Sequence, residues 1–116
     1  MAVLFKVIDP RGKSVLCTEE YWKKHIIGAR YWMEGWQDKV SATIEFPGAI
    51  FQDADYSNRE CYYQIDKNRR KYMKVVVSFG NDDQGMVITA FPSKAKMLVA
   101  TLSKRSRSWL TMISVP

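Results

Sequence analysis

The sequence predicts a single α+β domain, with two N-terminal helices packed on one face of a four-stranded or larger antiparallel meander sheet. The first observation is apolar spacing typical of helices in two stretches before residue 47. The second is a change of the apolar period from about 3.6 to about 2 residues after that point. The third is a set of short polar turns between the alternating stretches, which indicates neighbouring antiparallel strands. Helices that precede strands in this way are expected to cover one face of the sheet.

The composition fits one globular domain. The chain has 116 residues, 47% hydrophobic and 26% charged, which excludes extensive disorder. Its 18 Lys and Arg against 12 Asp and Glu give a net charge of +6, which favours polyanionic partners such as nucleic acid. Cys17 and Cys61 stand far apart and are expected to be free thiols in a reducing cytosol. With one histidine in the sequence, no metal or cofactor is expected.

The N-terminal stretch is too short and too polar for a signal peptide. The sequence also has no apolar run of about 18 residues that would span a membrane. We therefore expect a cytoplasmic protein without a membrane partner, and the sequence does not predict its oligomeric state.

The stretch Thr18–Met33 carries the histidine among four aromatic residues and several bases. Thr18 is of a residue type that caps helices, and the two glutamates after it suit the first turn, where the helix dipole favours negative charge. Apolar or aromatic side chains then recur at helical spacing from Tyr21, until Gly28 offers an end. His25 lies on this stripe, and the residues alone leave open whether it packs against Tyr21 and Trp22 or transfers protons.

A second helix is predicted over Trp36–Phe46, and Pro47-Gly48 ends it. The expected strands are Ala2–Ile8, Ser14–Cys17, Ala49–Asp53, Cys61–Asp66, Lys71–Phe79 and Met86–Phe91. Pro92-Ser93 is expected to end the last of them. Residues 94–116 form a basic extension whose two apolar runs fit either two strands or a helix and a strand.

The strand Lys71–Phe79 carries the strongest alternation in the chain. Met73, Val75 and Val77 share one face, which we expect to pack on the helices. Lys74 then looks out from the opposite face, which we expect to be open.

Polar side chains of the neighbouring strands are expected beside Lys74. Thr89 joins it if Ile88 lies on the helix side of the sheet. Either Tyr62 or Tyr63 lines the same surface, because parity alone does not choose between them.

Such a surface suits RNA cleavage without a metal. In that reaction the 2′-hydroxyl attacks the adjacent phosphate, so the site needs a base, an acid and cations at the crowded phosphorus. His25 would shuttle protons, Arg30 would clamp the phosphate through two N–H groups, and Lys74 would supply a point charge. Orienting hydrogen bonds would come from Tyr31, Tyr63 or Thr89.

Further bases are expected to contact RNA phosphates, with aromatic residues between them stacking on nucleobases. These bases are Lys23, Lys24, Arg69, Arg70, Lys71, Lys104, Arg105 and Arg107. Solvated turns and helix faces also account for such charges, and tryptophans are more often core residues than stacking platforms.

Five segments, in order, carry a family resemblance. They are YWKKHIIGARYWM, DKVSATIEFPGAIFQD, NRECYYQ, YMKVVVSF and GMVITAF. Together they resemble the phage-barnase-EndoU-colicin-RelE-like nuclease domains over about residues 15–93. The resemblance implies the barnase-like fold of that group, the BECR fold, and metal-independent ribonuclease activity. It also implies roles for His25, Arg30, Lys74 and Thr89.

One position departs from the pattern of that group, which has an Arg-His pair soon after the helix that carries the first histidine. This chain has Arg30-Tyr31 there. A tyrosine hydroxyl is a poor base at neutral pH. Either one proton transfer is weaker, or the protein binds RNA without cutting it.

The sequence therefore predicts a metal-independent endoribonuclease, a toxin or effector of a phage or mobile element, with an antitoxin or host protein as a further partner. The alternative is a non-catalytic module on the same fold that binds nucleic acid or a host protein as an inhibitor. A structural subunit is the third interpretation.

Overall fold

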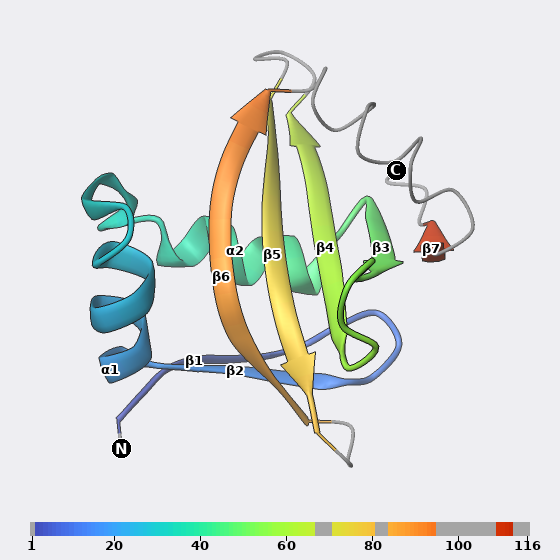
Figure 1. Ribbon diagram of the computed structural model, residues 1–116, viewed down its shortest axis with the longest axis horizontal. Coiled ribbons are helices and arrows are strands. Elements are labelled where there is room, and N and C mark those ends of the chain that lie inside the picture. The colour runs from blue at the N-terminus through green and yellow to red at the C-terminus, as the bar shows by residue number, and fades with distance from the viewer. Residues whose placement is uncertain (1, 67–70, 81–83, 95–108, 113–116) are drawn as a thin grey trace.

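One mixed sheet organises the fold, with its strands in the order β1-β2-β6-β5-β4-β3-β7 (Figure 1). The computed structural model describes residues 2–66, 71–80, 84–94 and 109–112. Within them the strands are β1 (Val3–Ile8), β2 (Ser14–Thr18), β3 (Ala49–Gln52), β4 (Arg59–Asp66), β5 (Lys71–Phe79), β6 (Gln84–Lys94) and β7 (Trp109–Met112). The α+β class is confirmed.

The sheet is larger than a four-stranded meander and is not wholly antiparallel. Strands β3 to β6 form the expected antiparallel meander. The hairpin of β1 and β2 joins it through a parallel pairing of Ser14–Leu16 with Gln84–Met86. This pairing brings together segments that are far apart in the chain, so the local pattern of either segment does not predict it.

Helical segments follow β2 in the described part of the chain, namely α1 (Glu19–Tyr21), η1 (Trp22–Ile27), η2 (Tyr31–Met33) and α2 (Gln37–Glu45). Thr18 caps the first of them as predicted, because its hydroxyl accepts a hydrogen bond from the Tyr21 N–H at 3.1 Å. The helix then widens into a π-helix, in which an N–H donates to the carbonyl five residues earlier. The Gly28 N–H makes such a bond to the Lys23 carbonyl at 3.0 Å.

Helix α2 packs on one face of the sheet, whereas the predicted packing of two N-terminal helices on that face is not confirmed. Figure 1 shows α2 crossing behind β4 and β5, whereas α1 lies beside β6. Beyond Met86 no described strand pairs with the outer edge of β6, and the first helical segment packs there instead. Trp22 and Ile26 of η1 still enter the same buried core as Val40 and Ile44 of α2.

The alternation of β5 is confirmed. Val75 and Val77 are fully buried in the core shared with α2, and Lys74 lies on the opposite face. In β4, Tyr62 lies opposite Val75 and Tyr63 lies opposite Lys74. The register therefore shows which of the two tyrosines lies beside Lys74. Tyr62 enters the main core, and Tyr63 shares the face of Lys74.

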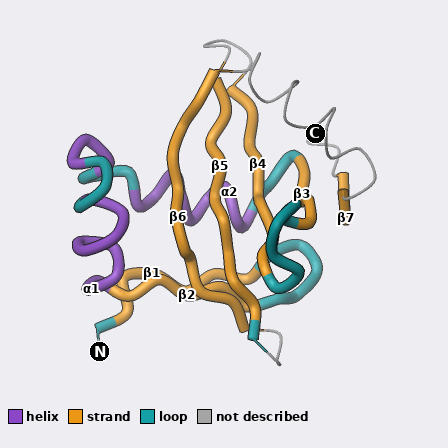
Figure 2. The backbone as a smooth tube through the Cα atoms, viewed as in Figure 1, coloured by secondary structure: helices purple, strands orange, loops and turns teal. Residues whose placement is uncertain are grey.

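Strand β6 is longer than predicted and passes through Pro92 to Lys94, as the continuous strand in Figure 2 shows. Pro92 lies opposite Met73 of β5, and no described strand pairs with its other side. A proline on such an edge is tolerated because its missing N–H faces away from the sheet. The prediction that Pro92-Ser93 ends the strand is therefore wrong.

The face that carries Lys74 is not open along its whole length. A second buried cluster occupies part of it, formed by Ala49, Phe51, Cys61, Tyr63, Tyr72 and Val76. The ring of Tyr63 lies edge-on to Phe51 at 5.7 Å and tilted against Tyr72 at 5.8 Å, measured between centroids. Aromatic packing of this kind favours burial over exposure of the tyrosine.

Asp9 closes the turn between β1 and β2 and ties it to β4. Its Oδ1 accepts hydrogen bonds from the Arg11 and Lys13 backbone N–H groups, at 2.8 and 2.9 Å. Its Oδ2 accepts from the Tyr62 hydroxyl at 2.7 Å and from the Arg11 guanidinium at 2.8 Å. Arg11 also donates to Glu60 of β4 at 2.5 Å. The hairpin is thus held to the sheet by a satisfied polar network.

Burial raises the pKa of Asp9, but hydrogen bonds from Tyr62, Lys13 and Arg11 lower it by more, as does the charge of Arg11. The pKa therefore lies below its ordinary value of 3.8. A pKa lower in the folded state than in the unfolded state means that the carboxylate stabilises the fold at neutral pH. That contribution is lost as the pH falls through the folded-state pKa.

The substitution Asp9→Asn keeps the size of this side chain but removes its charge. We expect the free energy of unfolding to fall by about 3 kcal/mol at neutral pH, because a buried ion pair loses one partner. The difference from the parent should begin to shrink below about pH 4, where the carboxylate is protonated in the unfolded state, and it should be lost as the pH falls through the lower folded-state pKa. Urea unfolding across this pH range measures both effects, with the exposed Asp55→Asn as the control. An equal loss at every pH would contradict the prediction.

Candidate functional site

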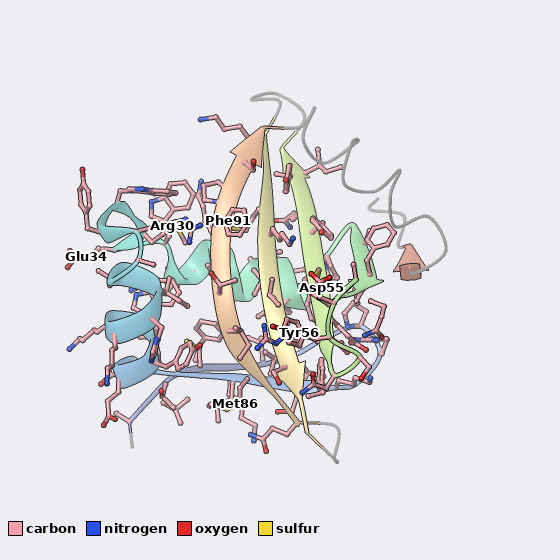
Figure 3. The ribbon with its side chains drawn as sticks, viewed as in Figure 1. Arg30, Glu34, Asp55, Tyr56, Met86 and Phe91 are labelled. Carbon is pink, nitrogen blue, oxygen red and sulfur yellow. The ribbon has the colours of Figure 1, made fainter. Side chains whose placement is uncertain are left out.

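Two cations from separate elements lie over one aromatic ring. The guanidinium carbon of Arg30 is 4.6 Å from the centroid of the Phe91 ring, and Figure 3 shows the two side chains together at β6. The Lys74 ammonium nitrogen is 5.9 Å from the same ring and 5.8 Å from the ring of Tyr63. Phe91 lies directly opposite Lys74 in the sheet, so both occupy one face. We call Arg30, Phe91 and Lys74 the cation cluster.

Neither cation of the cluster is neutralised by a carboxylate of the described residues. The ion pairs found there join Arg11 and Lys13 to Asp9 and Glu60. An exposed cation–π contact contributes only about 0.5–1 kcal/mol, far less than the attraction of a close anion in a partly desolvated site. The cation cluster is therefore suited to an anion from outside the described chain.

The backbone around Arg30 places its side chain over β6. The Arg30 N–H donates to the Ile26 carbonyl at 3.0 Å, and the Met33 N–H donates to the Arg30 carbonyl at 2.9 Å. Arg30 itself has φ −143° and ψ 88°, which is not helical. The chain thus changes direction here, between η1 and η2, and the guanidinium leaves the helical segment toward the sheet.

His25 lies on the surface of η1 and packs on Tyr21 of the aromatic stripe, as one of its two interpretations expects, while a role in proton transfer stays a prediction. Its ring is 4.3 Å from the ring of Tyr21 between centroids, tilted by 33°. The Tyr21 hydroxyl donates a hydrogen bond to the Ile88 carbonyl of β6 at 3.1 Å. Tyr21 therefore links the imidazole to the strand that carries Phe91.

Thr89 lies on the face of Lys74, although for a different reason than predicted. The register of β5 and β6 shifts so that Thr89 pairs with Val76 and Val87 with the next residue of β5. Ile88 is the extra residue of this bulge, and it packs against the second buried cluster. The condition under which Thr89 is predicted to lie there, with Ile88 on the helix side, is therefore not met.

Two of the predicted hydrogen-bond donors do not present a hydroxyl group at the cation cluster. Tyr63 is 1% exposed and its hydroxyl oxygen is buried, so it belongs to the second buried cluster. Tyr31 is 82% exposed, so it is not packed against the cation cluster. Both departures arise from packing between elements, which the strand and helix patterns do not encode.

The predicted RNA-contacting bases fall into two groups. Lys23 and Lys24 are exposed on η1, and Lys71 is exposed at the start of β5. The remaining bases lie outside the described residues, namely Arg69, Arg70, Lys104, Arg105 and Arg107. The same holds for the first apolar run of the C-terminal extension, while part of the second forms β7.

Sequence reasoning missed Phe91 and Tyr21 as members of the site. Phe91 follows Thr89 by two residues and so shares its face, and that parity is the signal that would have found it. Tyr21 stands four residues before His25, the spacing at which side chains of a helix meet. No pattern in the sequence predicts the hydrogen bond from the Tyr21 hydroxyl to β6.

Comparison of the chain with known protein families, curated proteins and solved structures finds no match. No described helix has the length and apolar character needed to cross a membrane. The described residues also contain no group of three or more His, Cys, Asp or Glu placed to hold a metal ion. The function is therefore inferred from the residues and their geometry.

Gly28 lies between His25 and Arg30, directly after the end of η1. A Cβ atom added at Gly28 would lie 2.2 Å from the Lys24 carbonyl oxygen, so Gly28→Ala forces the backbone to shift. We expect a loss of about 1–3 kcal/mol in the free energy of unfolding and a changed NMR signal of the His25 ring. Gly80→Ala is the matched control, since a Cβ there meets nothing within 4 Å. Unchanged stability and an unchanged His25 signal would refute the prediction.

Proposed function

We propose that this protein is a metal-independent endoribonuclease that cleaves RNA through its own 2′-hydroxyl. The observation that carries the proposal is the cation cluster, in which Arg30 and Lys74 share one ring without a carboxylate among the described residues. The exposed His25 stands on the helical segment that is bonded to the same strand. This combination supplies cations for a phosphate and one imidazole, a side chain that serves as a general acid or base in catalysis.

In the proposed cleavage the RNA's own 2′-hydroxyl attacks the phosphorus, and no water molecule takes part in this step. A base takes the proton of the 2′-hydroxyl as its oxygen bonds to phosphorus, and the bond from phosphorus to the 5′-oxygen breaks. The leaving 5′-oxygen takes up a proton, and a 2′,3′-cyclic phosphate remains. Arg30 offers paired N–H donors to the crowded phosphate, and Lys74 adds a compact charge. His25 is the proposed proton shuttle.

Two exposed aromatic residues that follow Arg30 in the chain suit an RNA ligand. Tyr31 is 82% exposed and Trp32 is 44% exposed, and both follow Arg30 directly in the chain. Aromatic side chains between bases stack on nucleobases without strong sequence preference. We therefore assign Tyr31 to stacking, while Thr89 remains the proposed hydrogen-bond donor on the face of Lys74.

The family resemblance supports the same proposal, because it assigns roles to His25, Arg30, Lys74 and Thr89. The barnase-like arrangement of the fold is part of this proposal, as is a cytoplasmic role as a phage or mobile-element toxin with an antitoxin or host protein as partner. The observation that supports the barnase-like arrangement is the α+β class of the described fold.

A second candidate function is RNA binding without cleavage. The observation that favours it is the exposure of Tyr31, which stands where the resembling domains have their second histidine. His25 is then the only imidazole for two proton transfers. The cleavage assay separates the two functions.

We expect the protein to cleave single-stranded RNA in EDTA and to leave cyclic phosphate ends. His25→Ala should lower the rate about 100-fold or more, since a general acid or base contributes that much. Arg30→Ala and Lys74→Ala should each lower it by a similar factor, through lost stabilisation of the phosphorane. Gel analysis of labelled RNA and mass spectrometry of its ends provide the measurement.

A matched control for this assay comes from the same chain. The Arg59 guanidinium carbon lies 4.0 Å from the Tyr56 ring centroid. Arg59→Ala therefore removes an equivalent cation–π contact away from the cation cluster and should retain the catalytic rate. Full activity of His25→Ala would remove the proposed mechanism, and binding without any product would establish the second candidate.

RNA affinity should fall steeply as salt rises, because each neutralised phosphate releases counterions. For single-stranded RNA the slope of log affinity against log salt is about −0.7 per contact, so Lys74→Ala should reduce it by about that amount. Fluorescence anisotropy with a labelled RNA at several salt concentrations measures the slope. A slope near zero would point to an apolar protein partner instead of RNA.

A further inference from the structure

A cavity of about 500 Å³ lies on the other side of the sheet, between α2 and the ends of β4, β5 and β6. This volume falls within the range of about 300–1,000 Å³ that is usual for small-molecule sites. Its walls are mainly apolar, with Trp36 and Ala42 from the helical side and Met73 and Pro92 from the strands. A flat, apolar group of nucleobase size fits such walls.

Two lysines stand at the cavity, Lys39 from α2 and Lys71 from β5. Both are exposed, and neither forms an ion pair with the described residues. One carboxylate, that of the exposed Asp38, also lines the cavity, so its charge in this part of the chain is positive by one unit. The apolar side chain of a protein partner would make no use of this surplus, whereas a phosphate would.

We infer that this cavity is a subsite for one nucleotide of the RNA, an inference that rests on the proposed function. The base enters between Trp36 and the strand side chains, and Lys39 and Lys71 bind the attached phosphate. Gln64 lines the cavity and donates its amide to the Phe46 carbonyl at 3.0 Å. The carbonyl end of the Gln64 side chain is left to accept a hydrogen bond from the amino group of a base.

The subsite and the cation cluster lie on opposite faces of the sheet, at consecutive residues near the end of β6. Phe91 belongs to the cluster and Pro92 lines the cavity, and these consecutive residues face opposite sides of the sheet. A second connection runs through η2, where the ring of Trp32 lies edge-on to Trp36 at 5.9 Å. Trp32 follows Arg30 by two residues. An RNA strand that passes over the end of β6 therefore reaches both places.

Calorimetric titration with AMP tests the subsite without relying on catalysis. AMP should bind, and ribose 5-phosphate, which lacks the base, should bind at least about tenfold more weakly. Lys39→Ala combined with Lys71→Ala should weaken AMP binding about tenfold, whereas Lys6→Ala, an exposed lysine on β1, should not. Ala42→Leu fills the cavity and should abolish binding.

Ser41→Leu is the matched control for Ala42→Leu, because Ser41 lies on the same helix but does not line the cavity. The absence of AMP binding at millimolar concentration, or binding that survives Ala42→Leu, would overturn the subsite. If Ala42→Leu removes AMP binding but leaves RNA affinity unchanged, the cavity serves a free nucleotide and the assignment to RNA is wrong. His25→Ala should retain AMP binding. The AMP titration therefore tests the subsite even if the proposed catalysis fails.

Discussion

The two unlike faces of β5 are the constraint on which the site depends. Val75 and Val77 have no exposed surface, so a slip of one residue would turn them outward and bury Lys74. Strands β4 and β6 both pair with β5 along its length, and its register therefore passes to them. Tyr62 is thereby directed into the main core, and Phe91 is directed to the face of Lys74. A local hydrophobic pattern in one strand thus positions three strands of the site.

The N-terminal hairpin of β1 and β2 reinforces that register through its contacts with β4. A tyrosine hydroxyl turned into the core has to find hydrogen-bond partners, and Asp9 and Arg11 supply them for Tyr62. Arg11 reaches Glu60 as well, so the hairpin holds β4 at two neighbouring positions on the same face. Buried polar groups that are all satisfied favour one arrangement over its alternatives, because any other pairing leaves a donor or acceptor without a partner. The network therefore contributes specificity as well as stability.

The sequence predicts those features that depend on local pattern. These include β5, α2, the Thr18 cap and the face of Lys74, each of which follows from the spacing of residues within one element. It does not predict the parallel pairing of β2 with β6 or the packing of η1 at the edge of β6, because both depend on contacts between distant segments. The same limit applies within the site. The place of Arg30 over Phe91 and the burial of Tyr63 are products of packing between elements.

The cations of the described residues have two kinds of surroundings. Arg11 and Lys13 are paired with carboxylates in a network that holds the hairpin, as structural cations commonly are. Arg30 and Lys74 are instead held against an aromatic ring, with no carboxylate of the described residues to neutralise them. Two like charges on one ring repel each other, and the repulsion is relieved when an anion binds between them. A pair of cations held over one ring in a sheet of fixed register is therefore suited to an external anion, and a phosphodiester is the anion that the proposed function assigns to it.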